Sequence, residues 1–167
     1  MSPRKGALLA IPLDRGRYCL AQLVGHYERQ APIVVVYEGI YPSAKIPEMP
    51  NVSSLTMRLI AYTLDAKIRS GDWDLIGESK VPLSVLLPAF KEMKSPPDTY
   101  EVVDALGLRR RPATDLEALR LPFRKIVSPK SLEKAVRAAN GLEVWQPSYD
   151  ALLPPREGNR EADLFVG

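Results

Sequence analysis

The chain has 167 residues, of which 46% are hydrophobic and 26% charged, and its formal net charge is +3. This composition is typical of one globular domain and excludes a disordered or membrane-spanning chain. The small basic surplus argues only weakly for a nucleic-acid partner.

The first apolar run, Ala7–Ile11, follows a basic start but is too short for the core of a signal peptide or for a membrane span. The single cysteine, Cys19, excludes an internal disulfide and fits a reducing compartment. We therefore expect a cytoplasmic protein without a membrane partner.

Two apolar runs, Ala7–Pro12 and Arg17–Val24, predict a first pair of strands. Between them lies Asp14-Arg15-Gly16, in which Gly16 supplies the positive φ that short hairpin loops need. A phosphate-holding loop would carry further glycines or lead into a helix. We interpret the segment as a hairpin.

Further strands are predicted at Ile33–Tyr37, Met57–Leu64, Gly71–Glu78 and Thr99–Gly107. Of these, Ile33–Tyr37 is continuously apolar and β-branched, which favours a central strand buried on both sides. The set predicts an α+β fold: one twisted, partly closed antiparallel sheet of about five or six strands, with the curvature of an SH3-like barrel.

One main C-terminal helix is predicted over Lys130–Ala139, since Ser128 can cap it, Pro129 suits its first turn and Gly141 follows it. Its apolar stripe should cover one open face of the sheet. We expect a single domain over 1–167, with a β-sheet core at 1–107, a helical and extended part at 108–153, and a tail at 154–167 that frays.

Few residues suggest catalysis. His26 is expected in an exposed turn after a strand, and Cys19 on a buried strand face. Asp72 and Asp74 alternate onto one strand face and could serve acid/base chemistry or hold Mg²⁺, but a solvated face opposite a buried Trp73 and Leu75 is the favoured interpretation. One histidine and one cysteine cannot make a zinc site unaided. We expect no catalytic residue, no metal and no cofactor.

Binding to another macromolecule is the remaining class, because interface cores favour aromatic residues, methionine and arginine. The proline-punctuated segment Glu38–Leu55 is the first candidate, since it carries apolar groups on a connection that should be solvated. The candidate contacts are, in order, Tyr41, Ile46 and Met49; then Arg109, Arg110 and Arg111 in an expected surface turn; then Trp145 and Tyr149, which we rather expect to dock the helix.

Three stretches resemble a known family when taken in order. They are "GALLAIPLDRGRYCLAQLVG" from Gly6, "DWDLIGESKVPLSVLLPAF" from Asp72 and "YEVVDALG" from Tyr100. The first two are similar to the opening and to the Trp-containing, Ile-Gly and Pro-rich segments of the immunity protein 26 family of bacterial polymorphic-toxin systems. Gly16, Tyr18, Trp73 and Gly77 fall within these matches and are interpreted as fold-forming residues. The second strand departs from the family at Cys19 and Ala21, and the resemblance does not extend to the region after Gly107.

The resemblance implies a non-enzymatic inhibitor that binds the catalytic domain of a cognate toxin and neutralises it by stoichiometric occlusion. Two alternatives remain open. One is a small-barrel nucleic-acid-binding module that uses Arg109–Arg111 and surface aromatics such as Tyr27 and Tyr41. The other is a carboxylate-dependent hydrolase that uses Asp72 and Asp74.

Overall fold

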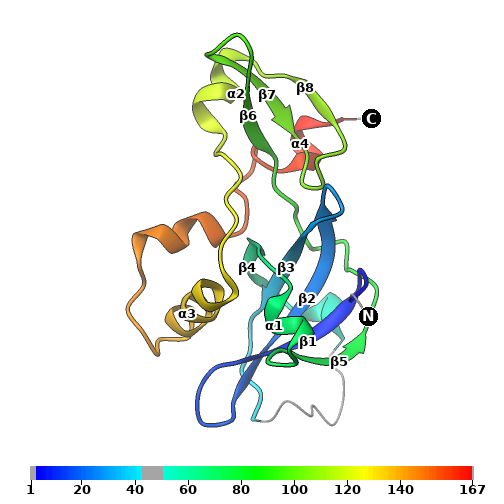
Figure 1. Cartoon of the computed structure of the whole chain (residues 1–167), viewed down its shortest axis with the longest axis vertical. Helices are drawn as coiled ribbons and strands as arrows, with labels where there is room; N and C mark the ends of the chain where they lie inside the picture. The colour runs from blue at the N-terminus through cyan, green and yellow to red at the C-terminus, as the bar shows by residue number, and fades with distance from the viewer. Residues whose placement is uncertain (1–2, 43–50, 167) are drawn as a thin grey trace.

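The computed structural model describes residues 3–42 and 51–166, which form an α+β protein with two antiparallel sheets (Figure 1). One sheet has five strands in the order β4-β3-β2-β1-β5, and the other has three in the order β6-β7-β8. The strands are β1 (Ala7–Pro12), β2 (Tyr18–Tyr27), β3 (Ala31–Tyr37), β4 (Met57–Tyr62), β5 (Asp74–Glu78), β6 (Phe90–Lys94), β7 (Thr99–Val103) and β8 (Arg110–Pro112). The helices are η1 (Val52–Ser54), α1 (Ala66–Arg69), α2 (Asp115–Arg120), α3 (Pro129–Ala139), η2 (Pro147–Leu152) and α4 (Glu161–Leu164).

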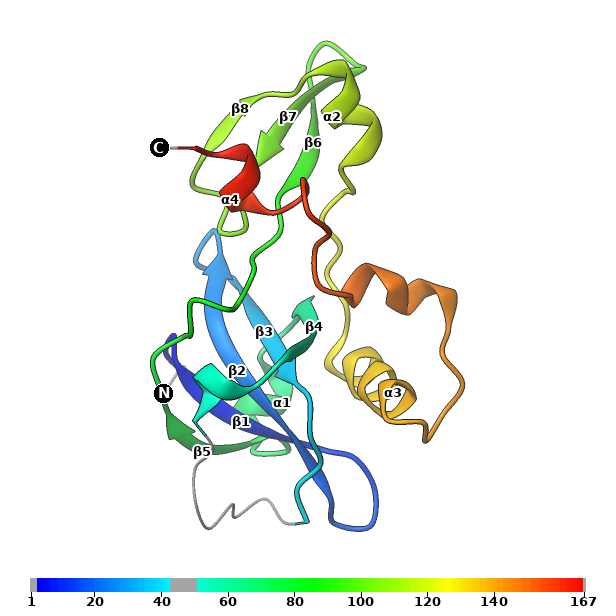
Figure 2. The same ribbon diagram turned by 180° about the vertical axis from the view of Figure 1, so that it is seen from behind.

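The two sheets lie at opposite ends of an elongated molecule (Figures 1 and 2). In both views α3 and η2 lie beside the five-stranded sheet, whereas α2 and α4 lie with the three-stranded sheet. The segment between α2 and α3 and the segment between η2 and α4 both run along the side of the molecule from one end to the other. We call the end with the five-stranded sheet the large lobe and the end with the three-stranded sheet the small lobe.

The predicted first hairpin is confirmed. Arg15 and Gly16 both adopt positive φ, at 44° and 76°, as the two central residues of a type I′ turn must. The Arg17 N–H donates to the Asp14 carbonyl at 2.7 Å, and the Arg17 guanidinium also pairs with the Asp14 carboxylate at 2.7 Å. The central strand is confirmed as well, because every residue of β3 is buried.

Helix α3 covers one face of the five-stranded sheet, as its apolar stripe predicts. Leu132, Ala135 and Val136 are buried in one cluster with apolar residues of β1 to β4. Trp73 belongs to the same cluster and is fully buried. Its indole N–H donates to the Glu133 carboxylate of α3 at 2.9 Å, so α3 is held to the sheet by a hydrogen bond as well as by apolar contacts.

The opposite face of the same sheet is also buried, and it joins the two lobes. Tyr62 of β4 contacts Phe90 of β6 edge to face, with ring centroids 5.3 Å apart, and Tyr27 of β2 at 6.1 Å. Val103 of β7 packs in the same cluster. Such edge-to-face pairs add to the free energy gained by burial alone, so the lobes meet through an aromatic core.

The expected single, partly closed, barrel-like sheet is wrong, because the described strands form two open sheets. The stretch from Pro82 to Pro88 leads into β6, which pairs with β7. Arg110 and Arg111 lie in β8, where a surface turn was expected. The cause is the loop 104–109: the buried Asp104 carboxylate accepts the N–H groups of Leu108 and Arg109 at 2.8 and 3.1 Å and turns the chain back onto β7.

The C-terminal part has several short helices besides α3, so the prediction of one main helix is also too simple. Residues 108–166 return to both lobes. The Val127 N–H donates to the Tyr62 carbonyl at 2.9 Å, and the Lys91 N–H donates to the Pro122 carbonyl at 3.0 Å. In the segment 154–166, the Glu161 carboxylate accepts the Ala105 N–H at 2.9 Å.

Candidate functional site

Arg109 and Arg110, the first two residues of the run Arg109–Arg111, form ion pairs with carboxylates of both lobes. The Arg109 guanidinium pairs with Asp104 at 3.0 Å. The Arg110 guanidinium pairs with Glu92 at 2.5 Å and with Glu28 at 3.1 Å. Both charges are therefore matched within the protein.

Arg111 makes the most specific of these ion pairs. Two of its nitrogens donate to the two carboxylate oxygens of Glu117, at 2.8 and 2.7 Å. These hydrogen bonds outweigh burial and, with those from Thr114, lower the pKa of Glu117 to about 2. A bidentate pair of this kind fixes geometry as well as charge. The pairing indicates that Arg111 connects β8 to α2.

Of the first candidate group, only Tyr41 falls among the described residues. It is half-buried and forms a bridge with Tyr18, in which each N–H donates to the other carbonyl at 2.8 Å. Ile46 and Met49 lie outside the described residues. Gly77 lies in β5 opposite Leu8.

The groups weighed for catalysis lie apart. Cys19 is buried, donates to the Gly39 carbonyl at 3.3 Å, and has its pKa raised by burial to about 11. His26 is half-buried within β2, so the expectation of an exposed turn residue is wrong; β2 runs on to Tyr27 because it continues to pair with β3.

The carboxylate pair is not on one strand face either. Strand β5 begins at Asp74, whereas Asp72 lies in the preceding turn and accepts a hydrogen bond from the Ser70 hydroxyl at 2.8 Å. Trp73 is buried as expected, but Leu75, in the edge strand β5, is 62% exposed because neither buried cluster of the sheet includes it. Within 3–42 and 51–166, no group of three or more His, Cys, Asp or Glu residues could hold a metal ion.

Trp145 and Tyr149 pack against the cluster beneath α3, as the favoured interpretation had it. Their rings meet edge to face with centroids 5.4 Å apart. The Trp145 indole N–H donates to the Asp150 carboxylate at 2.8 Å.

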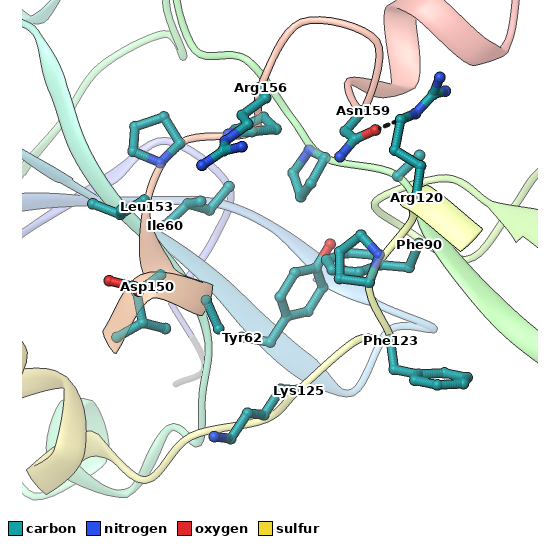
Figure 3. A pocket seen from close by; sticks show the side chains of 17 residues that line it. Ile60, Tyr62, Phe90, Arg120, Phe123, Lys125, Asp150, Leu153, Arg156 and Asn159 are labelled. Atoms are coloured by element: carbon teal, nitrogen blue, oxygen red, sulfur yellow. Dashed lines mark hydrogen bonds between the residues drawn. The ribbon is translucent and has the colours of Figure 1, made fainter. Parts of the chain in front are cut away.

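A pocket of about 440 Å³ lies where the two lobes and the C-terminal segments meet, and we call it the interlobe pocket (Figure 3). Its volume falls within the range of ligand-binding pockets. The Tyr62 and Phe90 rings lie near the centre of the view, with Arg156 above and Lys125 below them (Figure 3). The lining residues are Ile60, Tyr62, Pro88, Ala89, Phe90, Arg120, Pro122, Phe123, Lys125, Asp150, Ala151, Leu152, Leu153, Pro154, Pro155, Arg156 and Asn159.

The polar groups that line the interlobe pocket are predominantly cationic. Arg120 is held by the Asn159 side-chain oxygen at 2.8 Å and by the Gly158 carbonyl at 2.9 Å. Lys125 and Arg156 are exposed and have no ion pair with any residue in the described part of the chain. The single carboxylate of the lining, Asp150, already accepts the Trp145 indole N–H.

Two large apolar side chains lie exposed at the pocket. Phe123 is 54% exposed and Leu153 is 46% exposed. The Lys91 ammonium lies 4.8 Å from the Phe123 ring centroid and 5.2 Å from that of Tyr100. Exposed apolar groups bordered by charge are typical of surfaces that bind another molecule.

Sequence reasoning missed this pocket because its walls come from four separate segments, near residues 60, 90, 120–125 and 150–159. The stretch "RLPFRK" from Arg120 was the one local signal, since it sets an aromatic residue among cations. Nothing in the sequence indicated that this stretch lies beside Pro154 and Pro155.

Comparison with known proteins gives one family match. The model of the family described as Immunity protein 26 matches residues 4–109. No curated protein and no solved structure matches the chain. Among the described helices, none is long and apolar enough to cross a membrane. The matched residues include β1 to β7, whereas most residues that line the interlobe pocket come after residue 109.

Proposed function

The chain belongs to the immunity protein 26 family, and from this premise we propose that it binds a cognate bacterial toxin domain and neutralises it by stoichiometric occlusion. The observation that carries the proposal is the extent of the match, which takes in every strand of the large lobe and two of the three strands of the small lobe. Family membership suggests a non-enzymatic role. In the proposed setting the protein is made in the cytoplasm beside a polymorphic toxin.

The architecture supports occlusion because it offers a rigid body. Strands β1 to β4 of the five-stranded sheet are packed on both faces, by α3 on one side and by the aromatic core on the other. A surface held in its bound shape loses little conformational freedom on association, and this improves affinity.

The pairing of the arginine run weighs against the nucleic-acid alternative. Asp104, Glu92 and Glu117 each neutralise one of the three arginines. Of the two aromatic residues suggested for base stacking, Tyr27 is buried and Tyr41 is half-buried. A stripe of unpaired cations with exposed rings is what single-strand binding uses, and this part of the protein does not provide it.

The proposal is tested with the reading frame next to this gene in the source genome. We expect it to encode a large protein with a toxin-like C-terminal domain. Co-expression of that domain with this chain should restore growth that the domain alone abolishes. A catalytically inactive form of the domain should form a 1:1 complex with this chain in size-exclusion chromatography with light scattering.

The control is the same toxin domain expressed with the chain carrying Trp73→Ala, which is expected to destabilise the fold and so to weaken protection. Absence of a toxin-like neighbour, or a toxin domain that neither binds nor is neutralised, would contradict the proposal. Retention on RNA or heparin that falls steeply with salt would favour nucleic acid instead.

A further inference from the structure

We propose that the interlobe pocket is the anchor site for the partner, and that it receives an acidic segment flanked by apolar side chains. This inference rests on the proposed function, since the segment belongs to the toxin domain. It names the part of the surface that makes contact and the chemistry that the partner must present there.

The charge of the pocket argues for an anion. Lys125 and Arg156 are exposed without ion-pair partners in the described residues, whereas Arg109, Arg110 and Arg111 are each paired with a carboxylate. Arg120 adds a third positive charge that hydrogen bonds to Asn159 and Gly158 hold in place. A carboxylate that enters between these groups would meet complementary potential, which raises both association rate and specificity.

The floor of the pocket argues for apolar flanks around that anion. Ile60, Phe90 and Leu152 line it, and Leu153 and Phe123 extend the apolar surface to the rim. A small inorganic anion would leave these groups uncovered. An apolar side chain on either side of a carboxylate would cover them, as an aliphatic or aromatic anchor does in the centre of many interfaces.

The position of the pocket in the chain argues for a partner-specific role. The residues at its floor from β4 and β6 lie within the family match, but Arg120, Lys125 and Arg156 lie beyond residue 109. The shared scaffold thus provides Ile60 and Phe90 of the apolar floor, and the part of this chain outside the match provides the cations and the remaining apolar groups. We infer that the cations select the toxin.

The test compares two double charge reversals in the full chain, each of which lowers the net charge by four. Lys125→Glu/Arg156→Glu changes the pocket. Arg15→Glu/Lys80→Glu is the control, because both residues are exposed and Arg15 lies at the tip of the β1–β2 hairpin, far from the small lobe (Figure 1). Affinity for the inactive toxin domain of the neighbouring reading frame is measured by calorimetry.

We expect Lys125→Glu/Arg156→Glu to raise the Kd by at least about 100-fold and Arg15→Glu/Lys80→Glu to raise it by less than about threefold. For the apolar part, Leu153→Ser should weaken the Kd by about tenfold, whereas Leu83→Ser, at a residue that is 97% exposed, should leave it unchanged. Far-ultraviolet circular dichroism and the melting temperature of each variant establish that it is folded.

The possible results separate this inference from the proposed function. If the unchanged protein does not bind the toxin domain, both proposals are overturned. If it binds and the pocket pair binds equally well, the proposed function stands and the anchor site is wrong. A loss in the control pair alone would place the contact near the hairpin and would likewise overturn the anchor site.

Discussion

Replacing Trp73 with alanine should lower the free energy of unfolding by about 3–5 kcal/mol. The side chain is fully buried in the cluster beneath α3. A buried tryptophan removes about 150–250 Å² from water, which at about 25 cal/mol per Å² corresponds to about 4–6 kcal/mol. The alanine methyl group keeps about 1 kcal/mol of this, so both routes give the same range.

The hydrogen bond to Glu133 contributes part of this loss. Without the indole N–H, the Glu133 carboxylate keeps only the Lys67 ammonium, at 3.2 Å. Hydrogen bonds to charged groups contribute about 1.5–3 kcal/mol, and the partly exposed Lys67 pair contributes less than about 1 kcal/mol. Trp73→Phe, which keeps an aromatic ring but not the N–H, should therefore cost about 2 kcal/mol.

The measurement is urea unfolding followed by far-ultraviolet circular dichroism, with the slope m fitted for each variant. Trp145→Ala is the matched control, since that indole is only partly buried and its hydrogen bond to Asp150 is exposed. We expect it to cost less than about 2 kcal/mol. A Trp73→Ala variant within about 1 kcal/mol of the unchanged protein, at an equal m, would refute the reasoning.

The pKa of Glu117 is about 2 in the folded protein and about 4.3 in the unfolded chain, so its ion pair contributes its full stability above about pH 4.3 and loses it as the pH falls towards 2. The difference in urea midpoint between the unchanged protein and Glu117→Gln should therefore shrink below about pH 4.5 and vanish near pH 2. A difference that stays constant would contradict the pairing. Cys19, with its pKa raised to about 11, should not react with a thiol reagent at about pH 8 until the protein is denatured. Gly107→Ala should cost about 2–4 kcal/mol, because a Cβ would lie 2.8 Å from a buried tyrosine ring, whereas Gly141→Ala at the same φ of 76° meets nothing within 4 Å and should cost about 1 kcal/mol; equal costs would contradict the packing.

The elements that sequence predicted well are those with complete local signals. Gly16 indicated the turn of the first hairpin, and Ser128 with Pro129 indicated the start of α3. The Ser128 hydroxyl accepts the Ser131 N–H at 3.1 Å, as a capping residue should. The physical cause in each case acts over a few residues, so a single sequence contains it.

The second sheet could not be predicted in this way. In β6, "FKEMK" sets apolar and charged residues on both faces, so neither period stands out. Strand β8 is almost wholly basic, and its edge position depends on Asp104 and Glu117. Tertiary contacts override weak local preference in such segments.

The interlobe pocket was beyond prediction for a related reason, since residues far apart in sequence form its walls. Tyr62 forms a bridge with Ile126, and Lys91 forms one with Phe123. Neither contact produces a hydrophobic periodicity that the sequence could show. The position of "RLPFRK" between the lobes is therefore visible only in the folded protein.

Contacts of one tyrosine hold the two lobes together near the interlobe pocket. The Tyr27 hydroxyl donates to the Glu92 carboxylate at 2.6 Å and so links β2 of the large lobe to β6 of the small lobe. Burial, together with this bond, raises the pKa of Tyr27 to about 12; hydrogen bonds from Tyr27 and Arg110 hold the pKa of Glu92 below its usual value although burial raises it. The donor stays protonated and the acceptor charged through the neutral pH range, which keeps the bond charge-assisted. The Arg124 guanidinium stacks on the same ring, 3.4 Å from its centroid, and so positions its neighbours Phe123 and Lys125 at the pocket. An inhibitor that acts by occlusion gains affinity from such a preformed site, because little ordering remains to be done on binding.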